Sequence, residues 1–339
     1  MIVKLINGDY QALVDTKGAQ ILSFTNGIEE LFYDGALNPD NPNNTWKRTA
    51  PRLNNPGPHE KTFFYKGQTY ERSESRHGFL RNEEFKIEKQ TEKYVLLIFE
   101  QLPNKEFPFA HKVCVELSLT DKPKMETNGR FRKREVPHLE ERVWIVNTAK
   151  QHEVFASSLN QNNMIYAYGQ HPAFQITNPE RTFVFFTHLN KEKNCGVEER
   201  KRYFLDLEKL KQDKPETMKF LGIKSGTIHL CEQLNEKTFN EIANMDFIGP
   251  NILLWSNSIN SDSTKQFICI EPWQTFPGAF DKNLPKLEQL EKGKKYLSGE
   301  IAKSVILLGK KNSCLISSNY SFGRGVLPFA KENPRRVNL

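Results

Sequence analysis

Short strand-like runs separated by turn residues extend over most of the chain, and this pattern restricts its fold class. Residues 2–6 and 10–14 flank an Asn7-Gly8 turn, which predicts a β-hairpin. Helical periodicity is confined to residues 205–210. The further strand candidates are residues 20–24, 85–89, 94–99, 112–119, 142–146, 182–186, 251–255 and 304–308. Many short strands joined by Gly, Asn and Pro turns predict an all-β fold, either a sandwich or a barrel.

The length of the chain favours one large domain with two additions. A chain of 339 residues can bury a sizeable core, and all-β folds often exceed about 200 residues as one unit. We expect a single domain over residues 1–310. Residues 121–141 are rich in Lys and Arg, so we expect an exposed basic loop inserted there. We expect residues 311–339 to form a loosely packed tail.

Composition favours a cytoplasmic protein. The net charge of +7 is spread over the chain, so a solvated basic surface is its simplest interpretation, and a phosphate- or nucleic-acid-binding face is the alternative. The five cysteines lie far apart without a Cys-x-x-Cys pair, which predicts reduced thiols. No apolar run approaches the roughly 20 residues of a membrane-spanning helix. Residues 1–13 have no secretory signal pattern, and we expect an edge strand there.

Two short strings each place one titratable side chain beside a proline in an aromatic, apolar stretch. They are Gly-Gln-His-Pro-Ala-Phe at residues 169–174 and Cys-Ile-Glu-Pro-Trp at residues 269–273. Proline limits backbone motion, and desolvation raises the pKa of a carboxyl group toward values that suit a general base. His171 and Glu271 are therefore candidates for acid–base chemistry. The alternatives are a hydrogen-bonded core histidine and a buried Glu paired with an Arg.

Other motifs add weaker signals. His77 precedes Gly78, which allows close approach of a ligand. Arg48 and Arg52 offer planar, forked donors for sugar hydroxyls or an oxyanion. The sequence has no His/Cys cluster with metal-binding spacing, no phosphate loop and no Gly-x-Ser-x-Gly motif. No second carboxylate shares a motif with Glu271, which argues against glycoside hydrolysis. We expect neither a metal nor a cofactor.

Four strings in order resemble the aldose 1-epimerase (galactose mutarotase) family, most closely its LacX-like branch. They are Arg-Thr-Ala-Pro at 48–51, His-Gly-Phe-Leu-Arg at 77–81, and the strings around His171 and Glu271. The resemblance covers about residues 1–310. It implies an antiparallel β-supersandwich with few short helices and an open cleft across one sheet. It also implies cofactor-free interconversion of the α and β anomers of a free aldohexose.

The resemblance also implies roles for individual residues. Glu271 would take the proton from the C1 hydroxyl, and His171 would protonate the ring oxygen of the sugar across a sugar-sized gap. His77 would bind near that oxygen. Arg48 matches the substrate-binding arginine best, and Arg52 is the second choice. Glu241 stands where the family often carries a sugar-binding Asp.

Three other functions remain open at this point. A hexose-6-phosphate 1-epimerase on the same fold is favoured by the positive charge and by Arg48 and Arg52. A non-catalytic carbohydrate-binding protein could keep the same cleft. A nucleic-acid binder could use the basic segment at residues 121–141. The first choice implies a small aldose as the partner and neither nucleic acid nor a membrane. The sequence does not fix the aldose or the oligomeric state.

Overall fold

The computed structural model is built from antiparallel β-sheets, as the strand pattern predicted. In the described part of the chain the only helices are two 3-10 turns, η1 (Asp34–Ala36) and η2 (Leu80–Asn82). Neither is a long apolar helix of the kind that crosses a membrane. The structure describes residues 1–37, 48–53, 62–65, 68–71, 77–123, 135–148, 163–189, 198–204, 218–221, 226–247, 251–256, 266–274, 306–309 and 313–328.

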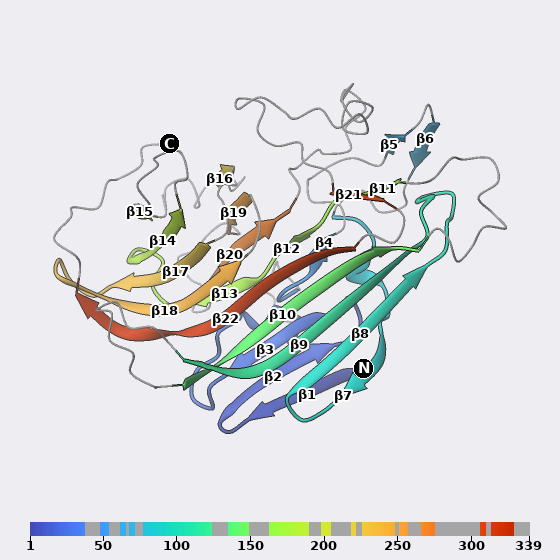
Figure 1. Cartoon of the computed structure of the whole chain (residues 1–339). Coiled ribbons are helices and arrows are strands. Elements are labelled where there is room, and N and C mark those ends of the chain that lie inside the picture. The colour runs from blue at the N-terminus through green and yellow to red at the C-terminus, as the bar shows by residue number, and fades with distance from the viewer. Residues whose placement is uncertain are drawn as a thin grey trace.

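The largest element is a curved nine-stranded sheet that crosses the whole molecule (Figure 1). Long central strands twist across it, and the two strands of the hairpin β9–β10 are paired over their full length. Its strands, in spatial order, are β15 (Glu198–Phe204), β14 (Thr182–Leu189), β17 (Gly226–Gln233), β18 (Thr238–Phe247), β22 (Ser313–Pro328), β10 (Glu135–Asn147), β9 (His111–Pro123), β8 (Tyr94–Gln101) and β7 (Lys86–Gln90).

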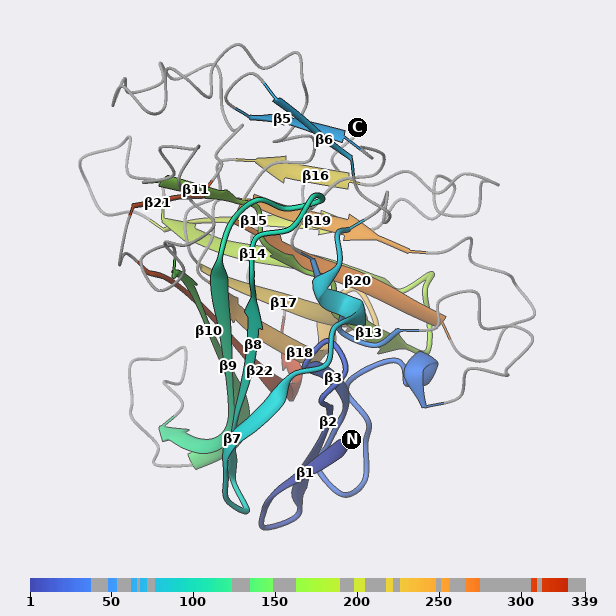
Figure 2. The same cartoon turned by 90° about the vertical axis from the view of Figure 1, so that its right-hand side faces the viewer.

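Smaller sheets accompany this layer. The six-stranded sheet contains, in order, β16 (Met218–Leu221), β19 (Asn251–Trp255), β20 (Gln266–Trp273), β12 (Gly169–Gln170) and β4 (Arg52–Leu53), with β13 (Ala173–Ile176) also paired to β20. The three-stranded sheet is β1 (Ile2–Asn7), β2 (Tyr10–Asp15) and β3 (Gln20–Thr25). Figure 2 shows it beside the β7–β10 end of the large sheet. Two-stranded sheets pair β5 (Thr62–Tyr65) with β6 (Gln68–Glu71), and β11 (Asn163–Tyr166) with β21 (Ile306–Gly309).

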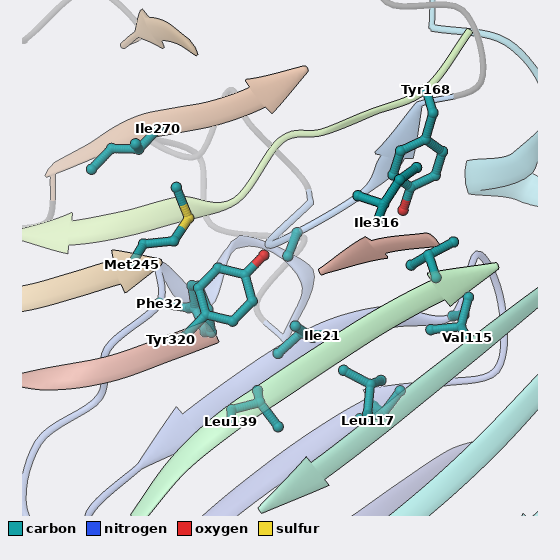
Figure 3. Packing of buried hydrophobic residues seen from close by; sticks show 14 of the residues in the cluster. Ile21, Phe32, Val115, Leu117, Leu139, Tyr168, Met245, Ile270, Ile316 and Tyr320 are labelled. Atoms are coloured by element: carbon teal, nitrogen blue, oxygen red, sulfur yellow. The ribbon is translucent and has the colours of Figure 1, made fainter. Parts of the chain in front are cut away.

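One hydrophobic core joins the three main sheets. Alternate residues of a strand face the same side, and in β9 the buried set includes Val115 and Leu117. Ile270 of the six-stranded sheet and Val14 of the three-stranded sheet belong to the same cluster. Figure 3 shows Ile270 and Tyr168 in the upper part of the core and Leu139 and Leu117 in its lower part, with Tyr320 between them. Burial of each large aliphatic side chain stabilises the fold by about 1.5–3 kcal/mol.

The described ends of the segment at residues 121–141 are strands and not parts of the exposed loop that its charge predicted. β9 and β10 pair residue by residue as far as Pro123 and Glu135, so most of the described part of the segment is a hairpin strand. Leu139 and Glu141 are buried. Glu141 points into the core, where an arginine pairs with it. Residues 124–134 lie outside the described residues.

The expected tail contains a central strand of the large sheet. β22 begins at Ser313 and lies between β10 and β18, so the domain does not end at residue 310. Ile316, Tyr320 and Phe322 point into the core. This alternation was a strand signal in the sequence. Residues 329–339 lie outside the described residues.

The other strand predictions were close to the observed bounds. The predicted hairpin is β1–β2, with the turn at Asn7 and Gly8. The candidates at residues 20–24, 85–89, 94–99 and 112–119 correspond to β3, β7, β8 and β9. Those at 142–146, 182–186, 251–255 and 304–308 correspond to β10, β14, β19 and β21, although residues 304 and 305 are not described. The helical candidate at 205–210 lies outside the described residues.

Candidate active site

The two candidate catalytic side chains are in direct contact. Nε2 of His171 lies 3.1 Å from Oε1 of Glu271. Both residues are buried, with exposures of 4% and 2%. The expected sugar-sized gap between them is therefore absent, and the imidazole and the carboxyl group form one closely spaced pair.

Strand alternation determines which way Glu271 points. Ile268 and Ile270 of β20 enter the main core, so Cys269, Glu271 and Trp273 face the opposite side of the six-stranded sheet. The carboxyl group has apolar neighbours on this side, which separate it from water. These neighbours are Leu253, which lies opposite Glu271 on β19, Cys269 and Trp273.

The backbone around His171 is fixed by hydrogen bonds to two neighbouring segments. Its N–H donates to the carbonyl oxygen of Pro51 at 3.1 Å, and the N–H of Ala173 donates to that of Thr49 at 2.8 Å. The carbonyl oxygen of Pro172 accepts the N–H of Ile270 at 3.1 Å. The Pro172 carbonyl thus joins the His171 segment to the residue just before Glu271, so the sequence motifs meet through the backbone as well as through the side chains.

Burial favours the uncharged form of each partner. It raises the pKa of the Glu271 carboxyl group well above its ordinary value, against a smaller lowering effect of Trp273. It lowers the pKa of the His171 imidazole well below its ordinary value, and the nearby charges of His77 and Arg81 lower it further. Near neutral pH we therefore expect the pair to hold one proton between a carboxyl group and a neutral imidazole.

His77 lies beside this pair, as the sequence predicted. Its ring centroid is 5.7 Å from that of His171, and the two rings meet edge to face. The backbone of His77 has a positive φ of 63°, followed by Gly78 at 71°. A left-handed conformation in a residue with a Cβ costs about 1–2 kcal/mol. Such strain is often found at functional sites, where the surroundings hold it in place.

The structure distinguishes the two arginines. Arg48 donates from Nη1 to the carbonyl oxygen of Arg81 at 2.9 Å and from Nη2 to Oδ1 of Asn82 at 2.6 Å, so it supports η2, which follows His77. Arg52 is 1% exposed and forms a buried ion pair with Glu141. This burial excludes Arg52 as a substrate contact in this structure, and the substrate-binding role of Arg48 stays a prediction.

Glu241 is not brought to the His171–Glu271 pair. Its Oε1 lies 2.7 Å from Nδ1 of His229, and it is opposite Gly325 in the register of β22. Ser318 of the same strand β22 donates to Gln170, the residue before His171. Ser318 is about seven residues from Gly325, or roughly 20 Å at the rise of an extended strand. Glu241 therefore belongs to a separate cluster on the large sheet.

Two neighbours of the site were missed in the sequence. The indole ring of Trp255 lies 5.7 Å from the imidazole of His171, between ring centroids. Trp255 follows a buried apolar run, and its register with Cys269 gives it the same sheet face as Glu271. Arg81 belongs to the His-Gly-Phe-Leu-Arg string, but no role was derived for it. Among the described residues, no group of three or more His, Cys, Asp or Glu side chains could hold a metal ion.

Comparison with known proteins identifies the fold. No family model and no curated protein matches the chain. A galactose mutarotase related enzyme from Lactobacillus acidophilus is 18% identical, with both chains covered by 100% and a TM-score of 0.64. A galactose mutarotase-like protein from Lactobacillus casei is 16% identical, with 94% of this chain and 99% of that chain covered and a TM-score of 0.62.

A third structure, a galactose 1-epimerase from Lactobacillus acidophilus, is 10% identical, with 96% of this chain and 94% of that chain covered and a TM-score of 0.53. At these identities the likeness establishes architecture. The chain has a galactose mutarotase-like fold, which confirms the fold that its four motifs predicted.

Proposed function

We propose that the protein is an aldose 1-epimerase that interconverts the anomers of a free aldohexose, with His171 and Glu271 as its acid–base pair. One observation carries this proposal: an imidazole and a carboxyl group lie 3.1 Å apart on an apolar sheet face. The mutarotase-like fold supports an epimerase-type activity. The free aldose as the substrate and the roles of the residues are the proposal.

The close contact of the pair suits the geometry of a cyclic sugar. The hydroxyl oxygen at C1 and the ring oxygen are bonded to the same carbon, so they are closer together than two hydrogen-bonded atoms. An acid and a base that exchange protons with these two oxygens must therefore be near neighbours. A small separation of His171 and Glu271 would admit both oxygens between them.

Ring opening moves two protons and leaves the protein unchanged over a full cycle. The base takes the proton of the C1 hydroxyl while the acid protonates the ring oxygen. The bond from C1 to the ring oxygen breaks, and a carbonyl group forms at C1. Rotation about C1–C2 and the reverse transfers close the ring on its other face. Acid–base catalysis of this kind typically contributes about 10²- to 10⁴-fold.

The pair can perform these transfers from either arrangement of its proton. The family resemblance assigns Glu271 as the base and His171 as the acid, which requires carboxylate and imidazolium. Burial instead favours a protonated Glu271 and a neutral His171 before substrate binds. The two arrangements are tautomers of one singly protonated pair, and each contains one donor and one acceptor. A polar sugar bound beside the pair would stabilise the charged tautomer relative to the neutral one.

A phosphorylated hexose is the second candidate substrate. One observation favours it: the positive charge of Arg81 is close enough to lower the pKa of His171. The sequence suggested Arg48 and Arg52 as phosphate ligands, but Arg52 is buried in an ion pair and does not serve as one in this structure. The presence of both an acid and a base argues against a purely non-catalytic sugar binder.

Polarimetry tests the proposal directly. Freshly dissolved α-glucose, α-galactose and α-glucose 6-phosphate are followed with and without protein. Faster rotation change with a free sugar supports the proposal, whereas a strong preference for the phosphate ester would select the second candidate. Calorimetric sugar binding without any acceleration would identify a binding protein. Glu271→Gln serves as the inactive control, which should still bind sugar.

A further inference from the structure

The buried ion pair of Arg52 and Glu141 lies next to the segment of His171, because Arg52 is opposite Gln170 in the register of β4 and β12. Arg52 is on β4 of the six-stranded sheet, and Glu141 is on β10 of the nine-stranded sheet. Their side chains are 1% and 2% exposed. A buried ion pair rarely stabilises a protein more than apolar side chains of the same size, so stability alone gives it no rationale.

The contacts of Arg52 join three sheets at one point. Its Nη2 donates to Glu141, and its Nη1 donates to the carbonyl oxygens of Gly18 and Ala19, just before β3. The hydroxyl of Tyr320 on β22 donates to the second carboxyl oxygen of Glu141 at 3.1 Å. Figure 3 shows Tyr320 reaching up into the core from the lower layer and Tyr168 reaching down from the upper one. Arg52 is therefore held on several sides.

This anchor is one residue away from the backbone partner of His171. The carbonyl oxygen of Pro51 accepts the N–H of His171, and Arg52 is opposite Gln170 in the strand register. The side chain of Gln170 is tied to the large sheet as well, because its Oε1 accepts the hydroxyl of Ser318 at 2.7 Å. A shift of Arg52 would therefore move the segment that orients the imidazole.

The same anchor reaches the His77 segment. Gly18, whose carbonyl oxygen binds Arg52, donates its N–H to the carbonyl oxygen of Glu83 at 2.7 Å. Glu83 follows η2, which comes shortly after His77. A Cβ on Gly18 would lie only 2.7 Å from the carbonyl oxygen of Arg81, so this turn packs tightly on η2. Arg52 thus connects the two segments that place histidines at the site.

We propose that Arg52 and Glu141 are positioning residues, which fix the His171 ring against Glu271 by clamping β4 to the large sheet. This proposal rests on the function proposed above, and it adds that the ion pair is maintained for the geometry of the site. Neither residue touches substrate. Their removal should therefore lower the rate of the chemical step more than the affinity for sugar.

The test compares two double variants, each of which removes an ion pair that involves β10. R52M/E141L replaces the buried pair with apolar side chains of similar size, which avoids an uncompensated buried charge. R142M/E140L removes the neighbouring pair, in which Arg142 Nη2 lies 2.8 Å from Glu140 Oε1 and the Arg142 side chain is 42% exposed. Both are measured by polarimetry for kcat and KM and by circular dichroism for folding.

We expect R52M/E141L to fold and to lose about 10- to 100-fold in kcat with a smaller change in KM, since small misplacements of reacting groups have effects of this size. The control should keep both constants. If R52M/E141L does not fold, R52K provides the second variant: it keeps the charge but lacks the fork that binds both Glu141 and the carbonyls, so we expect an intermediate loss of kcat. Wild-type kcat in the folded double variant, or in R52K, would overturn the proposal.

A second readout separates this proposal from the proposed function. The imidazole signals of His171, assigned by comparison with H171Q, are followed by NMR as a function of pH. In R52M/E141L we expect them to shift and the pKa of His171 to move toward its ordinary value of 6.5, with no change in the control. If the wild type accelerates no anomer exchange, the proposed function fails, and these signals still decide whether Arg52 positions His171. Unchanged signals would overturn the positioning role.

Discussion

Gly169 and Trp273 lie opposite each other on β12 and β20, so close that a side chain at position 169 has no room. An ideal Cβ on Gly169 would lie 2.6 Å from Cδ1 and 3.0 Å from Cγ of the indole. Trp273 is 3% exposed, and it faces the same side of β20 as Glu271. The lack of a side chain at position 169 therefore lets the Trp273 indole pack there and shield the Glu271 carboxyl group from water.

We expect Gly169→Ala to displace the Trp273 indole and to lower both stability and activity. Overpacking of this kind typically costs about 1–3 kcal/mol, and urea unfolding measures it. Polarimetry should show a loss of about tenfold or more, because the neighbour of Glu271 has moved. The double variant G169A/W273L makes room for the added methyl group and should recover part of the stability. A fully stable, fully active G169A would contradict this account.

Glu271→Gln should separate catalysis from stability. We expect mutarotation to fall by about 10²- to 10⁴-fold, because an amide cannot exchange a proton with the sugar. The folded pKa of Glu271 is raised, so above pH 4.5 the unfolded chain gains from an ionisation that the folded protein resists. Gln removes this penalty, and stability at pH 7 should stay equal or rise. The matched control is Glu140→Gln, which makes the same chemical change on β10, away from the His171–Glu271 pair, and should keep full activity.

The parts of the fold that local pattern encodes were predictable. Hairpins such as β1–β2 follow from alternation and a turn dipeptide, which act over a few residues. The strand ends at residues 121–123 and 135–141 were misjudged because charge was taken as a sign of exposure, and β22 was misjudged because it lies near the end of the chain, where segments often pack loosely. Glu141 is buried because Arg52, 89 residues away in the chain, neutralises it, and no local pattern contains that information.

The candidate site shows the same division. His171, Glu271 and His77 were found from their motifs, and the structure brings the three together. Arg52 and Glu241 carry suitable groups, but their strands place them elsewhere. Sequence pattern identifies which side chains could do the chemistry, whereas strand register and the choice of sheet face decide which of them meet.

The activity should persist to a lower pH than an ordinary histidine would allow. The pair is active with one proton, and it gains a second one only when His171 is protonated, at a pH below the ordinary imidazole value of 6.5. It loses its proton only when Glu271 ionises, well above the ordinary carboxyl value of 4.5. A plot of kcat/KM against pH should therefore show an acid limb below 6.5 and an alkaline limb well above 4.5. An acid limb above 6.5 would contradict the lowered pKa of His171.

A second buried histidine should make the fold sensitive to acid. His111 is fully buried in an aromatic cluster, with its ring centroid 5.2 Å from that of Phe107 and 5.3 Å from that of Tyr166. Burial lowers its pKa from 6.5 to about 4, although a hydrogen bond between Nδ1 and the carbonyl oxygen of Phe109 acts in the opposite direction. The unfolded chain therefore takes up a proton below pH 6.5 that the folded protein refuses until about pH 4.

Between these two pH values His111 alone should remove about 3 kcal/mol of stability, at 1.36 kcal/mol per pKa unit. Urea unfolding at a series of pH values measures this loss, and His111→Phe should flatten the curve while keeping an aromatic ring in the cluster. Tyr166→Phe is the control: it removes a buried hydroxyl that has no hydrogen-bond partner among the described residues, so it should shift the whole curve without changing its slope. An equally steep acid loss in H111F would show that other groups, His171 among them, control the response.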